Sequence, residues 1–266
     1  MSRYLTLPIF DGIVPGGFPY GSSYLIEFEP DSLWYETSLT ITAQALRHGM
    51  KTEYHTFMHL PKDIREGLAR LGLNLKRLEE DGIFRIIDTY TRVAGLGLVG
   101  EPVAGGLSLE IHQASFLDDL TAEMVGIVKE GVPEAEKGWL HVDDDASVLN
   151  RYRKEMEIID MWRTRIVPYL KVRELVLFHS LLTGIASESF YRQYENLCDG
   201  IIDFKSLEEE EEVEHYFRVR TMRGKKSDSR WQHLLLLNNG EVKVDAARPK
   251  VGELGISSWL KGPRKR

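Results

Sequence analysis

The sequence predicts an α/β protein with a mainly parallel central sheet and an antiparallel β extension at its C-terminal end. Over residues 22–205, short runs rich in β-branched and aromatic residues alternate with helical patterns, which is typical of βαβ units. From residue 213 onward, strand patterns follow one another without helices between them. Asn239 and Gly240 lie between the last two of these patterns and are a strong hairpin signal.

The strands expected in the α/β part are apolar runs bounded by turn residues. They cover residues 22–29, 52–58, 83–90, 138–142, 173–179 and 200–205. The strands expected in the extension cover residues 213–222, 231–237 and 241–245.

Helices are expected between the strands of the α/β part. The first covers residues 32–48, with Asp31 or Ser32 as its N-cap and Gly49 just past its end. Pro61 begins the second. Later helices are expected at residues 116–130, 146–168 and 187–198, and the glycine-rich residues 91–106 are expected to form a loop.

Composition places the chain among ordinary globular proteins. It has 266 residues, of which 42% are hydrophobic and 28% charged, so collagen-like and disordered classes are excluded. No apolar run approaches the roughly 18 residues of a membrane span, and the N-terminal apolar segment is too short for a signal peptide. A single cysteine, Cys198, excludes an internal disulfide and a cysteine-based zinc site, so a cytoplasmic protein is expected.

Charge is distributed unevenly along the chain, whose net charge is −7. Residues 248–266 carry six basic and one acidic side chain, which leaves −12 on the rest. We therefore expect one domain over residues 1–247 and a basic tail over residues 248–266. The tail is either a solvated terminus or a contact for nucleic acid or an acidic partner.

Common catalytic and cofactor motifs are missing or misplaced. Gly95, Gly97 and Gly100 form a GxGxxG string, but the proline and glycine pair that follow prevent a helix from beginning where a dinucleotide site needs one. Neither a G-x-S-x-G nor an HExxH motif is present, and the histidines are scattered. No metal site is predicted.

Several segments in colinear order point to a known family. They are residues 11–26 (DGIVPGGFPYGSSYLI), 70–90 (RLGLNLKRLEEDGIFRIIDTY), 138–152 (GWLHVDDDASVLNRY), 197–204 (LCDGIIDF) and 216–231 (YFRVRTMRGKKSDSRW). Over about residues 8–246 the chain resembles RecA-superfamily ATPase domains of the KaiC-like type. The resemblance implies a RecA-like three-layer sandwich with helices on both faces of the sheet.

The segment that should grip the nucleotide departs from the family's pattern. A P-loop has the pattern G-x-x-x-x-G-K-[ST], whose backbone N–H groups and lysine hold the phosphates. Here residues 30–37 read PDSLWYET, with no glycine between Gly21 and Gly49 and no Lys or Arg within residues 4–46. Only Thr37 matches. The resemblance therefore indicates a degenerate Walker A motif.

Other family positions are partly kept. Asp143 matches the Walker B aspartate, although Asp143–Asp145 also suit helix capping and their spacing does not decide between the roles. The family's catalytic glutamate pair is replaced by Met58 and His59. In the family the C-terminal hairpin reaches the neighbouring subunit's nucleotide, so Arg220 and Arg223 are expected at an interface.

These observations predict a pseudo-ATPase that is not an enzyme, needs no cofactor, and serves as a regulatory or assembly module. Its expected partners are copies of itself or an intact KaiC-like paralogue in a ring, with no membrane and no substantial nucleic-acid contact. A second hypothesis is a nucleotide- or metal-binding protein with an atypical site that uses Asp143. A third is a weak nucleic-acid-binding module that uses the basic tail.

Overall fold

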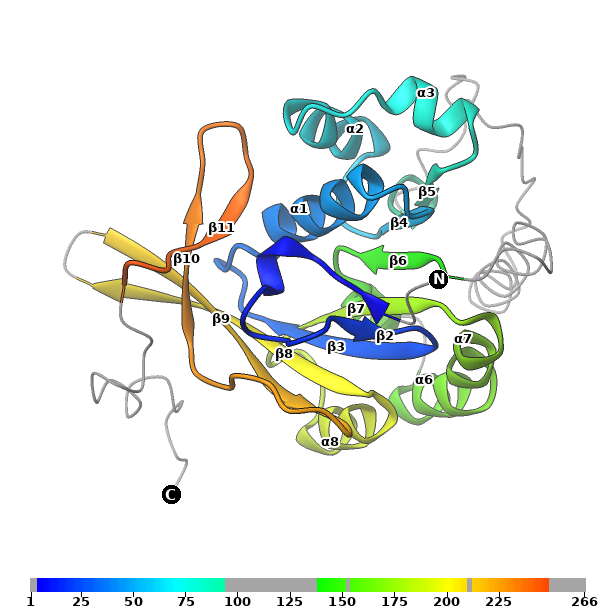
Figure 1. Ribbon diagram of the computed structural model, residues 1–266. Helices are drawn as coiled ribbons and strands as arrows, with labels where there is room; N and C mark the ends of the chain where they lie inside the picture. Colours follow the sequence, from blue (N-terminus) through cyan, green and yellow to red (C-terminus); the bar gives the residue numbers. More distant parts are fainter. Residues whose placement is uncertain (1–3, 94–137, 152–153, 210–211, 249–266) are drawn as a thin grey trace.

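The computed structural model describes residues 4–93, 138–151, 154–209 and 212–248, which form a twisted sheet between two layers of helices (Figure 1). This part of the chain contains a nine-stranded sheet. In sheet order the strands are β11 (Val242–Val244), β10 (Gln232–Leu236), β9 (Glu212–Met222), β8 (Gly200–Glu209), β3 (Ser22–Phe28), β7 (Val176–Leu182), β6 (Leu140–Asp143), β4 (Thr52–Thr56) and β5 (Phe84–Asp88). The six strands from β8 to β5 are parallel, and β9, β10 and β11 are antiparallel. The predicted fold class is confirmed.

Helices cover both faces of the sheet (Figure 1). One face carries α1 (Trp34–Arg47), α2 (Pro61–Arg70) and α3 (Leu75–Glu80), together with η1 (Pro8–Phe10) and the ribbon of β1 (Tyr4–Leu5) and β2 (Phe18–Pro19). The other carries η2 (Ala146–Arg151), α6 (Glu155–Met161), the π-helical turn η3 (Trp162–Ile166), α7 (Val167–Arg173) and α8 (Glu188–Leu197). A short helix, α4 (Tyr90–Val93), follows β5.

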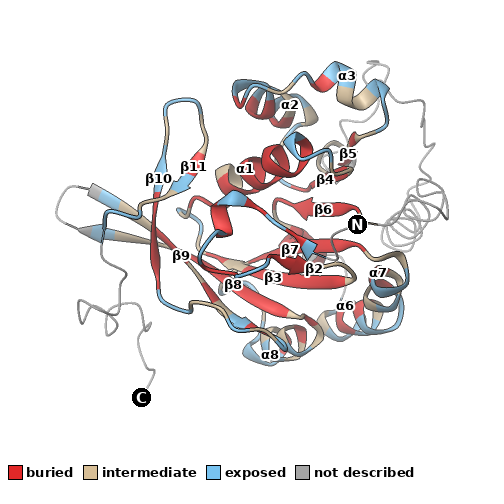
Figure 2. Cartoon of the chain, viewed as in Figure 1, coloured by how far each residue is buried: buried red, intermediate tan, exposed pale blue. Residues whose placement is uncertain are grey.

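The central strands are buried on both faces, as covered parallel sheets require (Figure 2). In β3, Tyr24 and Ile26 pack into the core under α1, whereas Leu25 packs into the core under α6–α8. Alternating side chains of one strand thus fasten both helical layers to the sheet. Apolar residues on both faces explain the unbroken apolar runs in the sequence.

The predicted helix over residues 146–168 is wrong, because the structure divides this stretch into η2, α6, η3 and α7. Lys154 is extended (φ −68°, ψ 143°) and separates α6 from η2. Farther along, Pro168 lies in the first turn of α7 and has no N–H to donate to a carbonyl four residues back, which interrupts regular α-helical hydrogen bonding there. The π-helical turn immediately before α7 accommodates this break.

Several predicted boundaries also differ from the structure, among them the end of β8, which lies four residues later than predicted. Helix α1 begins at Trp34 with Leu33 as its N-cap, and neither Asp31 nor Ser32 caps it. Strand β7 begins three residues later than predicted, because Glu174 adopts the left-handed conformation (φ 55°) that ends α7.

Some predictions fall outside the described residues. These are the three glycines of the GxGxxG string, the helix over residues 116–130, and the tail beyond Arg248. Across the residues that the structure does describe, no helix combines the length and the apolar character needed to cross a bilayer.

Candidate functional site

The candidate site lies at the carboxyl edge of the parallel strands. Strand β3 lies between β7 and β8, and the chain crosses from β3 toward β4 on one side and returns to β8 on the other. Open α/β sheets bind ligands outside the carboxyl ends of their strands, where the direction of crossing changes. The turn after β3 and the three aspartates that end β6 both lie at this edge.

A five-residue turn, residues 29–33, joins β3 to α1. The backbone N–H of Glu29 donates to Phe204 O at 3.1 Å, and that of Ser32 donates to Glu29 O at 3.0 Å. The Glu29 carboxylate pairs with Lys205 Nζ at 3.1 Å. The turn is therefore tied to β8, and none of its residues has a positive φ of the kind that requires glycine.

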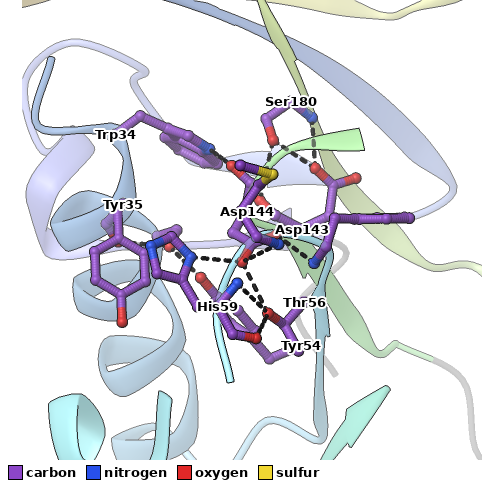
Figure 3. A network of polar contacts seen from close by, with 11 residues as sticks. Trp34, Tyr35, Tyr54, Thr56, His59, Asp143, Asp144 and Ser180 are labelled. Carbon is purple, nitrogen blue, oxygen red and sulfur yellow. Dashed lines mark hydrogen bonds and ion pairs between the residues drawn. The ribbon is translucent and has the colours of Figure 1, made fainter. Parts of the chain in front are cut away.

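Two aromatic side chains occupy the first turn of α1 (Figure 3). The buried Trp34 ring packs on Phe204 at 5.2 Å between centroids, and its Nε1 donates to Asp144 O at 3.1 Å. The Tyr35 ring stacks on the His59 imidazole at 3.8 Å. Trp34 and Tyr35 therefore occupy the start of α1, and their rings contact other residues of the same chain.

Asp143, which the sequence resemblance aligns with a Walker B aspartate, is buried and held by β7 (Figure 3). Its Oδ1 accepts the Ser180 backbone N–H at 2.8 Å and lies 2.5 Å from Ser180 Oγ. Its Oδ2 lies 2.5 Å from His179 Nδ1. Thr37 is also buried, and its hydroxyl has no hydrogen-bond partner among the described residues.

Asp144 binds the segment that follows β4 (Figure 3). Its Oδ1 accepts the Phe57 N–H at 2.7 Å, and its Oδ2 lies 2.9 Å from Thr56 Oγ1 and 2.8 Å from His59 Nδ1. The Asp144 side chain is fully buried, whereas the His59 side chain is 33% exposed. Asp144 therefore fixes the orientation of an imidazole that reaches the surface.

Several acidic groups lie at the carboxyl edge. Burial raises the pKa of Asp145 to about 6, although Asp145 Oδ1 accepts the Ser147 N–H at 2.9 Å at the start of η2. Burial, followed by the nearby carboxylates of Asp144, Asp63 and Glu36, raises the pKa of Tyr35 to about 12. An anion approaching this edge meets several carboxylates.

Arg223 follows β9 beside the amino end of β8, away from this edge, whereas Arg220 reaches Glu27 next to the end of β3. Arg220 Nη2 contacts Glu27 Oε2 at 2.6 Å and Asp203 Oδ1 at 2.8 Å, and its Nη1 contacts Glu195 Oε1 at 2.7 Å. Arg223 is exposed and donates from Nη2 to Asn196 O at 2.9 Å. Arg220 is thus bound within its own chain, and the structure does not bring either arginine to Thr37 or Asp143.

Sequence reasoning missed the acidic partners of Arg220. Glu27 interrupts the apolar run of β3, and an isolated carboxylate in such a run was a usable signal of a buried ion pair. Asp203 and Glu195 carried no comparable signal, because strand register and helix packing bring them to Arg220. In the part of the chain that the structure describes, no three His, Cys, Asp or Glu side chains are placed to hold a metal ion.

Comparison with known proteins supports the fold. No protein-family model matches the chain. A UPF0273 protein of Methanopyrus kandleri is 23% identical over 265 residues, covering 94% of each chain. The crystal structure of a KaiC-like protein from Pyrococcus horikoshii superposes with a TM-score of 0.67 at 16% identity, covering 92% of this chain and all of that one. With the strand order and the helices on both faces, this structural similarity shows that the chain has the fold of that KaiC-like protein.

Proposed function

We propose that this protein is a KaiC-like domain that does not hydrolyse ATP and acts as a regulatory or assembly module in the cytoplasm. The proposal rests on the side chains that occupy the carboxyl edge. Trp34 and Tyr35 fill the start of α1, and protein donors already bind Asp143 and Asp144.

The residues present do not fit a nucleoside triphosphate with magnesium. Residues 4–46 supply no Lys or Arg, while Glu29, Asp31 and Glu36 place carboxylates around the turn. Like charges about 4 Å apart repel by about 1 kcal/mol in water and about 4 kcal/mol near a protein surface. The turn therefore disfavours the polyanion that a P-loop holds.

The groups that would catalyse phosphoryl transfer are also missing from the described part of this edge. Phosphoryl transfer is catalysed almost entirely by positioning and by stabilisation of charge. The side chain in place of the family's catalytic glutamates is His59, whose Nδ1 is bound to Asp144. Lys205, beside the turn, is paired with Glu29. The described residues 29–37 supply no cation to clamp the phosphates, which supports an inactive domain.

A folded domain that lacks catalytic groups can still take part in assembly. Rings form through heterologous head-to-tail contacts, and an inactive subunit can complete one. We propose that the chain associates with copies of itself or with an intact KaiC-like protein. Arg223 is the interface candidate that we retain, because it is exposed, whereas Arg220 is held by three carboxylates of its own chain.

Calorimetry with ATP or ADP and magnesium, followed by a turnover assay, tests the proposal. We expect millimolar or undetectable binding and no turnover, together with a concentration-dependent rise in mass in light scattering after gel filtration. Charge reversal in Arg223→Glu should shift this rise to higher concentrations. Lys243→Glu, at a surface lysine on β11, serves as the matched control.

The alternative is a nucleotide- or metal-binding protein with an atypical site. It is favoured by the buried Thr37 hydroxyl, which has no partner among the described side chains and backbone groups. Micromolar binding that Asp143→Asn abolishes, in a variant with unchanged circular dichroism, would support this alternative and contradict our proposal.

A further inference from the structure

A cluster of charged side chains lies between the sheet and helix α8, near the end of β3 and on the face of the sheet opposite α1. Glu27 of β3, Asp203 of β8 and Glu195 of α8 all contact the Arg220 guanidinium of β9 at 2.6–2.8 Å. Arg218 also contacts Asp203, with Nε to Oδ2 at 2.6 Å. Three carboxylates thus face two guanidinium groups, which leaves one negative charge without compensation when all are ionised.

A β-bulge aims Arg220 into this cluster. In the β8–β9 ladder, Ile201 pairs with Thr221 and Ile202 pairs with Val219, so Arg220 is an additional residue on β9. A bulge of this kind bends the strand and redirects a side chain. Here it places one guanidinium group where it reaches β3, β8 and α8 together.

A proton on Glu27 would balance the cluster. Its Oε1 is buried and receives no hydrogen bond from the described residues, and Glu27 and Glu195 contact the same guanidinium group, at 2.6 and 2.7 Å. Two carboxyl groups brought together in this way can hydrogen-bond to each other only when one of them is protonated. Burial, followed by the charges of Asp203 and Glu195, raises the pKa of Glu27 to about 7, although Arg220 opposes the rise.

Within the described part of the chain, the groups that act on Glu27 include no cation besides Arg220. From α8 and the residue that follows it, Tyr191 and Cys198 face Glu27, and burial raises the pKa of both. From β7, the residue in register with Glu27 is the apolar Leu181. The charge of Glu27 is therefore balanced by Arg220 or by a proton.

We propose that Glu27, Glu195 and Arg220 form a proton-controlled latch that holds the C-terminal half of α8 on the sheet. With the proton on Glu27, its carboxyl group donates to Glu195 and the latch is closed. When the proton leaves, two carboxylates face each other across a partly dry contact. The Glu195 side chain gives way, because it is 25% exposed, against 14% for Glu27 and 7% for Asp203.

The direction of the pH effect follows from proton linkage. The closed latch holds a proton that the opened state releases, because solvation returns Glu27 toward its ordinary pKa of 4.5. The ratio of open to closed latch therefore rises by up to about tenfold per pH unit between Glu27's ordinary range and neutrality. Above neutrality the ratio levels off, because both states are then ionised.

Hydrogen exchange of the full chain tests this latch. After correction for intrinsic exchange rates, protection of the backbone amides of residues 191–197 should fall by up to about tenfold from pH 5.5 to pH 6.5. Protection in α2 should not change over the same range. Glu27→Gln should remove the dependence, because the amide keeps a donor toward Glu195 at every pH. Glu188→Gln removes one charge from the same helix outside the cluster and should leave the dependence intact.

A second measurement keeps the proposal testable if Glu27→Gln does not fold. Carbon-13 NMR of glutamate carboxyl groups in the unaltered chain should show one group titrating near pH 7, and Glu195→Gln should move its titration downward. Protection in residues 191–197 that is independent of pH, or a dependence equally lost in Glu188→Gln, would overturn the latch.

Discussion

Asp144 shows how one carboxylate shapes the carboxyl edge of the sheet. Its two oxygens bind backbone and side-chain donors from residues 56–59, so the segment after β4 closes over β6. The same residue accepts the Trp34 indole through its carbonyl oxygen. Asp144 therefore links β4, β6 and α1 and positions both aromatic contacts of the site.

Removing this carboxylate should be costly. We expect Asp144→Ala to lower the free energy of unfolding by about 3–5 kcal/mol, because several buried donors lose their acceptor at once. Asp144→Asn should cost less, since its amide oxygen still accepts. Urea unfolding measures both, and Asp31→Ala at an exposed position of the turn should stay within about 0.5 kcal/mol of the unaltered protein. An Asp144→Ala loss as small as the control's would contradict the role given to Asp144.

The sequence predicts part of this site and not the rest. Asp143 can be recognised in the sequence as a carboxylate at the end of a buried strand. The absence of the P-loop lysine and glycines can also be read directly from the sequence. The donors that bind Asp143 are not visible, because Ser180 and His179 meet it only through the register of β6 and β7. The partner that each of the three successive aspartates binds is determined by the tertiary structure.

At the scale of elements, the strands were easier to predict than the long helix. Parallel strands buried on both faces leave continuous apolar runs, and those runs located every strand of the sheet to within a few residues. The helix over residues 146–168 was wrong because apolar periodicity continues through a π-helical turn and a proline-bearing start of α7. Periodicity detects a buried face, and it does not detect a change in backbone hydrogen bonding.

The N-terminal ribbon supplies a test of an element. Gly12 and Gly17 both have φ of 75°, which costs any other residue about 1 kcal/mol or more. A Cβ at Gly17 would overlap the Leu5 carbonyl group, with 2.8 Å to its carbon, whereas a Cβ at Gly12 meets nothing within 4 Å. We expect Gly12→Ala to cost about 1 kcal/mol and Gly17→Ala roughly 1–3 kcal/mol more, measured by thermal or urea unfolding. Equal losses of unfolding free energy in the two variants would contradict this expectation and would show that the backbone at Leu5 shifts at little cost.

For the whole molecule, several buried titratable groups act on stability in opposite directions. Burial lowers the pKa of His141 to about 4, so its hydrogen bond from Nδ1 to Glu53 at 3.2 Å is made by a neutral ring. Glu27 and Asp145 have raised pKa values, so folding keeps protons on them. Acidification therefore weakens the fold through His141 and strengthens it through the two carboxyl groups.

A comparison of variants isolates the histidine. The folded pKa of His141 lies below its ordinary value of 6.5, so its contribution is complete above pH 6.5 and is lost as the pH falls toward 4. We expect the stability advantage of the unaltered protein over His141→Gln to shrink by about 2 kcal/mol from pH 7 to pH 5. Urea unfolding at both values measures it.

The burial of Trp34 has a consequence for the mutations that this turn can accept. The indole contacts Phe204 of β8 from the first turn of α1, so it belongs both to the start of the helix and to the interior. Replacing Trp34 with a small residue would leave a hole the size of an indole in the interior and would destabilise the protein. Single mutations that make room for a ligand at Trp34 therefore pass first through a less stable protein.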